Sequence, residues 1–362
     1  MKVALANSCS YLGGAEFWQR RFARFLQAAG DEVKFFLRPG KFFDLVKSQG
    51  HKPVEIAMRH DLDLFSILQF YRGLKIFQPE VVIFNDQRDL RLGAIAAGLA
   101  DVPLKLQRKG WSYLKGSFRD RFYYKRVDYV ACLSESITRL FVEKLKMPKS
   151  RLYNLPNGVE LERFQNLDPG ALRRTVGAGD GEVLLGMAGR LARQKRQGDL
   201  VRAVKILQGR GFKVRALLAG EGKERPGLTA LVKELDMTAT VQFLGFVDKI
   251  EEFLAGLDIF VFCSEWEGMP NAVLEAMACG KPVVAANIPG VKELVENEKN
   301  GILYPPGDVQ VLAARLEMLI TDQAFAAELS RAGRRTIEEK FDERKIFLAF
   351  REWLMQRLKE KG

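Results

Sequence analysis

Short hydrophobic runs that alternate with helical patterns, in two successive series, constrain the fold of this chain more than any other feature. The runs are rich in Val, Ile, Leu and Phe, and the stretches between them repeat apolar residues at helical spacing. Such alternation predicts an α/β protein in which helices cover parallel sheets. The 362 residues are enough for two such domains. The predicted strands span residues 3–6, 32–37, 54–56, 81–84, 104–107 and 129–133, and then 183–188, 213–219, 241–244, 259–263, 282–286 and 302–304.

The break between the two series lies in residues 156–181, which are rich in Gly, Pro, Asn and Asp and indicate a linker. We therefore predict an N-terminal domain over residues 1–160 and a C-terminal domain over residues 161–340. The stretch 341–362 has helical periodicity. We expect it to form a C-terminal helix that packs back toward the N-terminal domain.

Hydropathy and cysteine spacing exclude several classes of protein. No apolar run approaches the ~20 residues that a membrane-spanning helix needs, and the N-terminal run turns polar after six residues, which favours a strand over a secretion signal. The cysteines, at positions 9, 132, 263 and 279, have no CxxC spacing. Neither a zinc site nor a disulfide framework is predicted, and a cytoplasmic protein is expected.

Positive charge is concentrated in the first half of the chain. Residues 1–160 hold 27 Lys and Arg against 16 Asp and Glu, whereas the rest of the chain holds 30 against 29. One domain is therefore expected to face something anionic, such as phospholipid headgroups, a phosphorylated acceptor or nucleic acid. Simple solubility is the alternative explanation.

A basic aromatic stretch, residues 105–126, contains eight Lys and Arg, one Asp and six aromatic residues. Aromatic rings favour the lipid–water boundary, and each cation near an anionic membrane adds about 1 kcal/mol of binding. The composition predicts peripheral docking to the inner face of the cell membrane; alternatively, half of the aromatics are core residues and the cations are solvated. No stacking-platform motif supports a nucleic-acid partner. The aromatic residues are Trp111, Tyr113, Phe118, Phe122, Tyr123 and Tyr124.

Two glycines, Gly13 and Gly14, follow the first predicted strand and open a helix. Glycines permit a tight turn and a close approach of the backbone to a ligand, and a helix N-terminus offers free N–H groups. The pattern is not GxGxxG, which disfavours a dinucleotide site. A bare turn followed by the acidic Glu16 explains it equally well.

Two cations, Arg190 and Lys195, follow the strand predicted at 183–188. Ligands of open α/β sheets bind outside the carboxyl ends of strands. There, a guanidinium and an ammonium would together grip a diphosphate. The alternative is a basic surface loop without a ligand.

Two glutamates, Glu267 and Glu275, flank the start of a helix predicted over residues 270–279. Pro270 suits the first turn of such a helix and Gly280 suits its end. Backbone N–H groups at the helix start can receive phosphate oxygens, and the carboxylates can accept hydrogen bonds from sugar and ribose hydroxyls. Apolar neighbours of Glu275 disfavour the alternative of an ordinary exposed helix residue.

These motifs together resemble the retaining glycosyltransferases of family 4, also described as glycosyl transferases group 1. The resemblance implies the GT-B fold, in which two Rossmann-like doubly wound domains face each other across a cleft. It spans nearly the whole chain and is strongest over residues 181–308. Further segments that carry it are 156–159 with Phe164, 219–222, 244–245 and 301–305.

The resemblance also implies a role for each motif residue. Arg190 and Lys195 would neutralise the donor diphosphate, Glu267 would contact hydroxyls of the transferred sugar, and Glu275 would bind the ribose. The family retains anomeric configuration by front-face attack and needs neither a metal nor another cofactor. Backbone contacts to the donor would come from Gly13 and Gly14 of the facing domain and from Gly268, Met269, Pro270 and Asn271.

One local feature differs from the family pattern, and another matches a metal-binding motif of an unrelated fold class. Many relatives have a histidine after the fourth strand, where this chain has Asn85 and Asp86. These two side chains would either contact the sugar or acceptor or serve only as a helix cap. The string Asp61-Leu62-Asp63 matches a metal motif of another fold class, but a helix cap is the better interpretation because a helical run follows.

The predicted activity is transfer of a hexose or N-acetylhexosamine from a nucleotide-diphosphate sugar to a glycan or lipid-linked acceptor, in the assembly of lipopolysaccharide or another cell-surface polysaccharide. A UDP-sugar donor is favoured over GDP-mannose. The alternatives are a GDP-mannose-dependent mannosyltransferase, a phosphorylase or epimerase on the same fold, and a non-catalytic glycan- or lipid-binding protein. Sequence alone leaves the acceptor, the linkage and the oligomeric state open.

Overall fold

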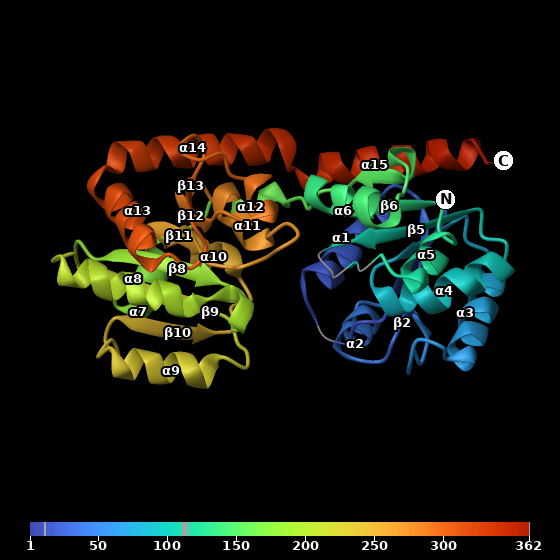
Figure 1. The fold of residues 1–362 in the computed structure, drawn as a ribbon, viewed down its shortest axis with the longest axis horizontal. Helices are drawn as coiled ribbons and strands as arrows, with labels where there is room; N and C mark the ends of the chain where they lie inside the picture. Colours follow the sequence, from blue (N-terminus) through green and yellow to red (C-terminus); the bar gives the residue numbers. More distant parts are fainter. Residues whose placement is uncertain (11, 111–113, 115, 362) are drawn as a thin grey trace. The chain divides into compact units, whose positions relative to one another are not determined.

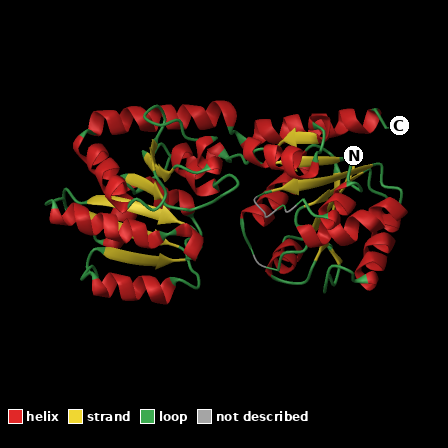
Figure 2. Cartoon of the chain, viewed as in Figure 1, coloured by secondary structure: helices red, strands yellow, loops and turns green. Residues whose placement is uncertain are grey.

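The computed structural model divides the chain into two compact units (Figure 1). The first comprises Met1–Asn157 together with Arg344–Gly362, and the second comprises Gly158–Glu343. In each, a parallel sheet lies between helices (Figure 2). The residues that the structure describes are 1–10, 12–110, 114 and 116–361.

The sheet of the first unit has the strand order β3-β2-β1-β4-β5-β6-β7. The chain adds strands toward one edge as far as β3 and then returns to place β4 on the other side of β1. The predicted strands are present with small shifts at their ends, and β7 was missed because it has only three residues. The strands are β1 Lys2–Asn7, β2 Glu32–Leu37, β3 Val54–Glu55, β4 Val81–Phe84, β5 Leu104–Lys109, β6 Tyr129–Cys132 and β7 Leu152–Asn154.

Several helices of the first unit begin at a residue whose side chain caps them. Asp63, for example, is the N-cap of α3, and its carboxylate accepts from the amide of Ser66 at 3.2 Å. Trp111 and Tyr113 of the basic aromatic stretch lie outside the described residues. The helices are α1 Gly14–Ala28, α2 Lys41–Ser48, α3 Leu64–Phe77, α4 Gln87–Leu99, α5 Phe118–Tyr124, α6 Glu135–Leu145 and α15 Glu343–Lys359.

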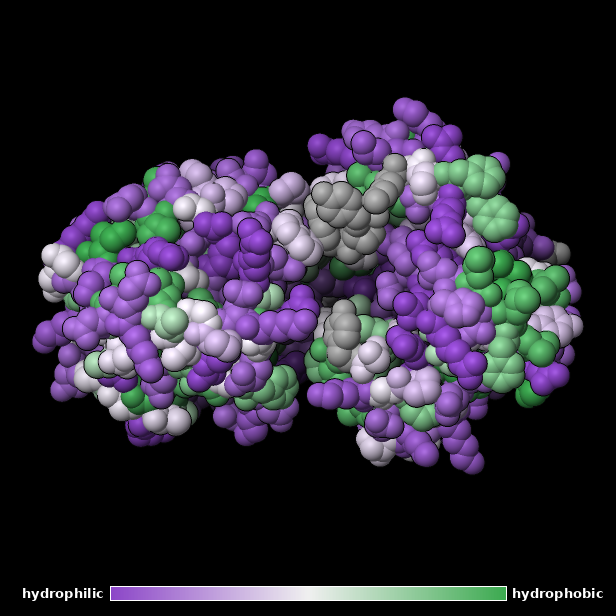
Figure 3. Space-filling view, turned by 60° about the horizontal axis from the view of Figure 1, so that its bottom comes forward, coloured by the Kyte–Doolittle hydropathy of each residue, from purple (hydrophilic) through white to green (hydrophobic). Residues whose placement is uncertain are grey.

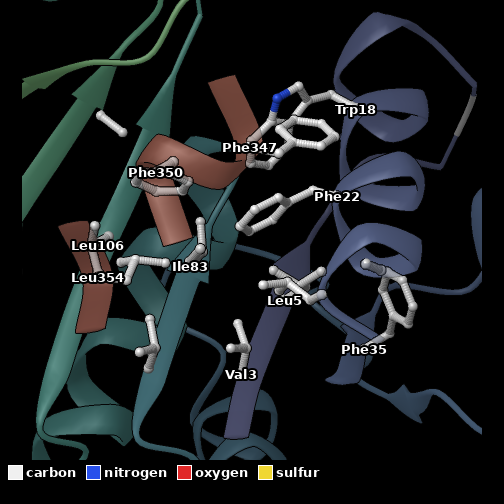
Figure 4. Close-up of a cluster of buried hydrophobic side chains, with 14 of the residues drawn as sticks. Val3, Leu5, Trp18, Phe22, Phe35, Ile83, Leu106, Phe347, Phe350 and Leu354 are labelled. Carbon is white, nitrogen blue, oxygen red and sulfur yellow. The ribbon is translucent and has the colours of Figure 1, made fainter. Parts of the chain in front are cut away.

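The C-terminal helix α15 completes the core of the first unit (Figure 4). Trp18 and Phe22 of α1 stack with ring centroids 5.0 Å apart, and Phe347 of α15 meets both rings edge-on. Phe350 of α15 lies 5.4 Å from Phe22. All four rings are buried. Burial of large aromatic rings is a dominant source of core stability, so the first unit depends on a helix from the far end of the sequence.

The second unit has the same layered architecture, with the strand order β10-β9-β8-β11-β12-β13. All six strands match the prediction to within one residue at either end, because most of them are buried hydrophobic runs bounded by polar or glycine-containing turns. The strands are β8 Val183–Ala188, β9 Val214–Ala219, β10 Val241–Gly245, β11 Ile259–Phe262, β12 Val283–Ala286 and β13 Ile302–Tyr304.

Helices of the second unit cover both faces of this sheet (Figure 2). The helix predicted over 341–362 begins two residues later than expected, because Asp342 forms a β-bridge with Val159 between α14 and α15. None of the helices in the described part of the chain has the length and apolar character needed to cross a bilayer. The helices are α7 Pro169–Val176, α8 Gln197–Gly209, α9 Arg225–Glu234, α10 Ile250–Ala255, α11 Asn271–Ala278, α12 Pro289–Lys292, α13 Val309–Thr321 and α14 Gln323–Lys340.

Candidate functional site

The loops after β8 and β11 hold most of the site residues predicted from the sequence. The two strands are neighbours in the sheet, although β9 and β10 lie between them along the chain. The direction of strand addition reverses between them. Open α/β sheets bind ligands outside the carboxyl ends of strands at such a switch point, so this edge of the second unit is the candidate site.

Two glycines bring the loops after β8 and β9 into direct backbone contact. Gly189 and Gly220 have φ angles of +142° and +141°. A Cβ atom on Gly220 would lie 2.0 Å from the carbonyl oxygen of Gly189, so a side chain does not fit there. The amide of Gly189 also donates to the carbonyl of Ala219 at 2.9 Å. These contacts fix the start of the loop that carries Arg190 and Lys195.

Lys195 and Glu267, 72 positions apart in the sequence, form an ion pair at this edge. The distance from Lys195 Nζ to Glu267 Oε1 is 2.5 Å, and each side chain is 18% exposed. Gln194 donates from Nε2 to the same carboxylate oxygen at 3.2 Å. The ammonium also lies 5.4 Å from the ring centroid of Phe262 at the end of β11. The structure therefore brings together two predicted site residues, in a partly desolvated setting where their charges interact more strongly than in water.

Arg196, which sequence reasoning missed, ties the two site loops together. Its guanidinium bonds to Asp199 at 2.7 Å and to Glu265 at 2.8 Å, and these hydrogen bonds raise the pKa of Arg196. The amide of Glu265 donates to the carbonyl of Gln194 at 2.9 Å. Arg196 itself has a left-handed backbone, with φ +51°. The charge pair at positions 196 and 199 was a sequence signal for part of this arrangement.

The loop that leads into α11 packs against helix α12. A Cβ atom on Gly290 of α12 would lie 2.4 Å from the carbonyl oxygen of Glu267, so the two backbones touch. Gly268, Met269 and Pro270 are buried, and Asn271 begins the helix. The first N–H groups of a helix lack partners within it and form a ready site for anions.

Two buried polar atoms lie on either side of the Glu267 loop. Among the described residues, neither the hydroxyl of Ser264 nor the amide oxygen of Asn271 has a hydrogen-bond partner. Buried polar groups are nearly always satisfied in folded proteins, and exceptions cluster where a ligand or water supplies the partner. Neither atom was singled out for this reason from the sequence.

The remaining predicted donor residues, Arg190 and Glu275, occupy different parts of this edge. The Arg190 side chain is exposed, and in the part of the chain that the structure describes its guanidinium has no ion pair or hydrogen bond. Its carbonyl accepts from the buried side chain of Gln197 at 3.0 Å, which holds the backbone of the loop. Glu275 is half-buried in the second turn of α11, with Leu274 and Ala276 buried beside it.

In the first unit, Gly13 and Gly14 form the start of α1. Gly13 is the N-cap residue and Gly14 is exposed. The nearby Glu16 is buried, and its carboxylate accepts from the side-chain amide of Asn7 at 3.0 Å. The acidic residue of this motif therefore holds the end of β1, while contact of the two glycines with a donor stays a prediction.

Asp86, one of two residues that replace the family's histidine, acts as a helix cap. It caps α4 in a reciprocal arrangement with Asp89, whose carboxylate accepts from the amides of Asn85 and Asp86 at 2.8 Å each. The Ser8 hydroxyl donates to Asp86 at 3.1 Å. Burial, reinforced by the neighbouring Asp86 charge, raises the pKa of Asp89. The cap interpretation is confirmed for Asp86, which leaves contact with a sugar or acceptor as a prediction.

The Asp61-Leu62-Asp63 string likewise has a structural role. Asp63 caps α3, as the sequence predicts, and its carboxylate also accepts from the Ser66 hydroxyl at 2.7 Å. Asp61 forms an ion pair with Arg91 of α4. The two carboxylates therefore hold the start of α3, and the helix-cap interpretation is confirmed.

Comparison with known proteins identifies the families and enzymes that the chain is similar to. A model described as glycosyl transferases group 1 matches residues 170–336, and one described as glycosyltransferase family 4 matches residues 12–163. The capsular polysaccharide biosynthesis glycosyltransferase CapM of Staphylococcus aureus is 24% identical over 311 residues, which are 81% of this chain and 82% of CapM. The UDP-Gal:alpha-D-GlcNAc-diphosphoundecaprenol alpha-1,3-galactosyltransferase of Escherichia coli is 27% identical over 295 residues, 77% of this chain and 76% of that enzyme.

A solved structure supports the same assignment at the level of the fold. HepE of Anabaena, in complex with UDP, matches with a TM-score of 0.86 and 23% identity, over 98% of this chain and 100% of HepE. Its fold corresponds to the two Rossmann-like units described above. With both family models matching and together covering most of the sequence, this chain belongs to glycosyltransferase family 4 and has the GT-B fold.

Proposed function

We propose that this chain transfers a hexose or N-acetylhexosamine from a UDP-sugar to a glycan or lipid-linked acceptor, with retention of configuration, in the assembly of lipopolysaccharide or another cell-surface polysaccharide. The observation that carries the proposal is the ion pair of Lys195 with Glu267 at the switch point of the second unit. A cation for a diphosphate and a carboxylate for sugar hydroxyls are thus already adjacent, close to the start of α11.

The pair suggests how donor binding would proceed. An incoming diphosphate offers Lys195 a doubly charged partner, which would compete with Glu267 for the ammonium. Glu267 would then be released to accept hydrogen bonds from the sugar hydroxyls. Arg190, whose guanidinium is exposed, would supply the second cation. Positive charge next to the departing diphosphate stabilises the leaving group as its charge develops.

The other predicted contacts follow from position. Glu275 in the second turn of α11 would bind the ribose, and the backbone from Gly268 to Asn271 would receive phosphate oxygens at the helix start. The buried amide oxygen of Asn271, and the hydroxyl of Ser264, would gain a partner from the donor. We propose that two cations and a helix terminus suffice for this chemistry without a metal ion or another cofactor.

Relatives support the choice of donor and pathway. HepE of Anabaena was solved with UDP-glucose, and the similar Escherichia coli enzyme is named for a UDP-Gal donor. CapM is named for capsular polysaccharide biosynthesis. We accordingly favour a UDP-sugar over GDP-mannose and a cell-surface acceptor. We also propose an anionic membrane surface on the cytoplasmic side as a partner, because lipid-linked acceptors are held there.

Thermal unfolding with nucleotides tests the donor site. UDP should raise the midpoint of unfolding more than GDP, since a ligand that binds only the folded state stabilises it. Arg190→Ala should abolish the shift, whereas Arg193→Ala, an exposed cation in the same loop, should preserve it. A shift that survives Arg190→Ala, or a larger shift with GDP, would contradict the corresponding part of the proposal.

A non-catalytic binding protein on the same fold is the competing function. It would show the nucleotide-dependent stabilisation without any release of UDP from a UDP-sugar. A screen of donor hydrolysis across UDP- and GDP-sugars separates the two functions, and addition of a chelator to the active reaction tests the absence of a metal requirement. The mannosyltransferase alternative predicts turnover of GDP-mannose in the same screen.

A further inference from the structure

Helix α3 of the first unit exposes a row of large apolar side chains. Ile76 is 85% exposed and Leu64 is 78% exposed, and Phe65 and Leu68 are also exposed. Their spacing places them along one side of the helix, opposite the buried Phe70. Figure 3 shows apolar side chains gathered at this end of the unit. Single exposed leucines are ordinary, but several large apolar side chains exposed on one side of a helix mark an interaction surface.

The charges on α3 identify the kind of surface that it fits. The helix contains no Asp or Glu, and its exposed cations, Arg72 and Lys75, lie on the same side as the apolar row. Helices that lie in the interface of an anionic bilayer likewise combine large apolar side chains with cations.

Helix α5 repeats this combination. Phe118 is 83% exposed and Phe122 is partly exposed, and the guanidinium of Arg126 lies 3.6 Å from the centroid of the Phe122 ring. The acidic residue of α5, Asp120, is buried and caps the helix with Ser117. The exposed cations of the helix and its C-cap are Arg119, Arg121 and Lys125.

Helix α4 joins α3 and α5 into one layer. It packs against both helices. Arg91 of α4 pairs with Asp61, just before α3, and its guanidinium lies 5.9 Å from the ring centroid of Tyr123 on α5. Tyr123 and Tyr124 are buried, so the aromatic residues of the basic stretch divide between core and surface. The exposed residues of α3 and α5 thus belong to the same helical layer of the first unit.

We propose that this α3–α5 surface docks on an anionic lipid bilayer, with the apolar row of α3 inserted among the headgroups and the cations of both helices in contact with lipid phosphates. This inference rests on the membrane association in the proposed function. It goes further because it names the residues that contact the bilayer and adds an apolar contribution to the electrostatic attraction. A second copy of the chain fits less well, since a two-fold contact would place cations against cations. A bilayer supplies both the apolar interior and the anions.

Vesicle sedimentation of the full chain tests the proposal. It should pellet with vesicles that contain phosphatidylglycerol and much less with pure phosphatidylcholine. The triple variant Leu64→Ser, Phe65→Ser and Leu68→Ser should bind the anionic vesicles at least about tenfold more weakly, because each lost apolar side chain removes surface that would enter the bilayer. Because these side chains are exposed, the variant should unfold at the wild-type temperature.

Two further variants make the result specific. Phe246→Ser removes an aromatic ring that is 73% exposed in the second unit, and it should leave vesicle binding unchanged. Arg119→Gln with Arg121→Gln should weaken binding about fivefold per charge and reduce its dependence on salt. In the wild-type protein, the apolar component should leave measurable binding at high salt.

Three outcomes would overturn the inference. They are equal pelleting with neutral and anionic vesicles, unchanged binding of the triple variant, and a lipid-free dimer in sedimentation velocity that the triple variant abolishes. The last would assign the surface to contact between copies. Vesicle binding needs no nucleotide, so it separates this inference from the donor site: UDP should stabilise the triple variant as it does the wild type.

Discussion

The ammonium of Lys195 lies 2.5 Å from a carboxylate oxygen of Glu267, although the two residues belong to loops that follow different strands. Gln194, the residue before Lys195, donates a hydrogen bond to the same carboxylate oxygen of Glu267. Each loop therefore orients the other's charged group before any donor arrives. Such preorganisation is the property that makes electrostatic stabilisation effective during a reaction.

Loss of the Lys195 ammonium should lower the turnover number much more than it lowers the stability of the folded protein. Lys195→Met keeps the length of the side chain and removes its charge, so kcat for donor turnover should fall about 100-fold to 1,000-fold. Arg193→Met, two positions earlier and exposed, should change kcat less than about threefold. Initial rates of UDP release at saturating UDP-sugar measure both variants. Similar losses in the two would mean that general positive charge, rather than this ammonium, is what matters.

Glu267→Gln should separate nucleotide binding from sugar transfer. The substitution frees Lys195 from its carboxylate partner, so stabilisation of the protein by UDP alone should be retained or increased. Turnover of the UDP-sugar should fall, because an amide accepts hydrogen bonds from the sugar hydroxyls less strongly than a carboxylate. Thermal shift and UDP release, measured on one preparation, give both quantities. Loss of the UDP shift would instead assign Glu267 to nucleotide binding.

Gly220→Ala should destabilise the second unit. The new Cβ would lie 2.0 Å from the carbonyl oxygen of Gly189 at a φ angle of +141°, so both contact and backbone oppose it. We expect a loss of about 1–3 kcal/mol of unfolding free energy. Gly209→Ala is the matched control, since a Cβ there meets nothing within 4 Å at the end of α8. It should be neutral or stabilise by up to about 1 kcal/mol. Urea unfolding distinguishes the two.

Because of Lys109, the stability of the first unit should depend on pH in the alkaline range. Burial lowers the pKa of Lys109 from 10.5 to about 8, against the opposing effects of Asp86 and Asp120. A group with a depressed pKa in the folded state binds its proton more tightly when unfolded, so stability should rise as the pH increases from about 8 to 10.5. Lys109→Met should remove that rise, whereas the exposed Lys52→Met should not. Parallel pH profiles of the two variants would contradict this pKa.

Removal of one ring from α15 should weaken the first unit. Phe350→Ala takes a fully buried ring out of the cluster with Phe22, and core Phe→Ala changes cost about 3–5 kcal/mol. Leu348→Ala, on an exposed position of the same helix, should cost less than about 1 kcal/mol. Denaturant unfolding followed by near-ultraviolet circular dichroism measures both. Equal losses would mean that α15 acts through its backbone position and not through this ring.

Features encoded within a few neighbouring residues could be predicted from the sequence. The strands of both sheets follow from hydrophobic runs, and the cap at Asp63 follows from a short polar residue placed before a helical pattern. The three-residue strand β7 has too few residues to give a pattern, and it pairs with β6 only in the folded unit.

Features that depend on packing between distant loops could be predicted only in part. The motif resemblance grouped Lys195 with Glu267 around one diphosphate sugar, but the direct contact between them depends on the angle at which two loops leave the sheet. The unpartnered atoms of Ser264 and Asn271 have no local signal, because burial is decided by neighbours far away in the sequence. For Arg196, the sequence signals only the pairing with Asp199, whereas the contact with Glu265 depends on how the two loops pack. The exposed side of α3 was missed for a related reason, since its apolar residues resemble core positions until the packing is known.

Because α15 is synthesised last, the two units do not complete their folding in the order in which they are made. The residues that form the second unit are all made before Phe347 and Phe350, so it can fold as one continuous segment while Trp18 and Phe22 still lack their covering helix. The N-terminal unit, made first, is therefore completed last, and until then it presents an open aromatic surface to the ribosome exit and to chaperones. Cleavage of the chain after Asn157 would separate the sequences but would leave the first of them without the side chains that α15 contributes to its core.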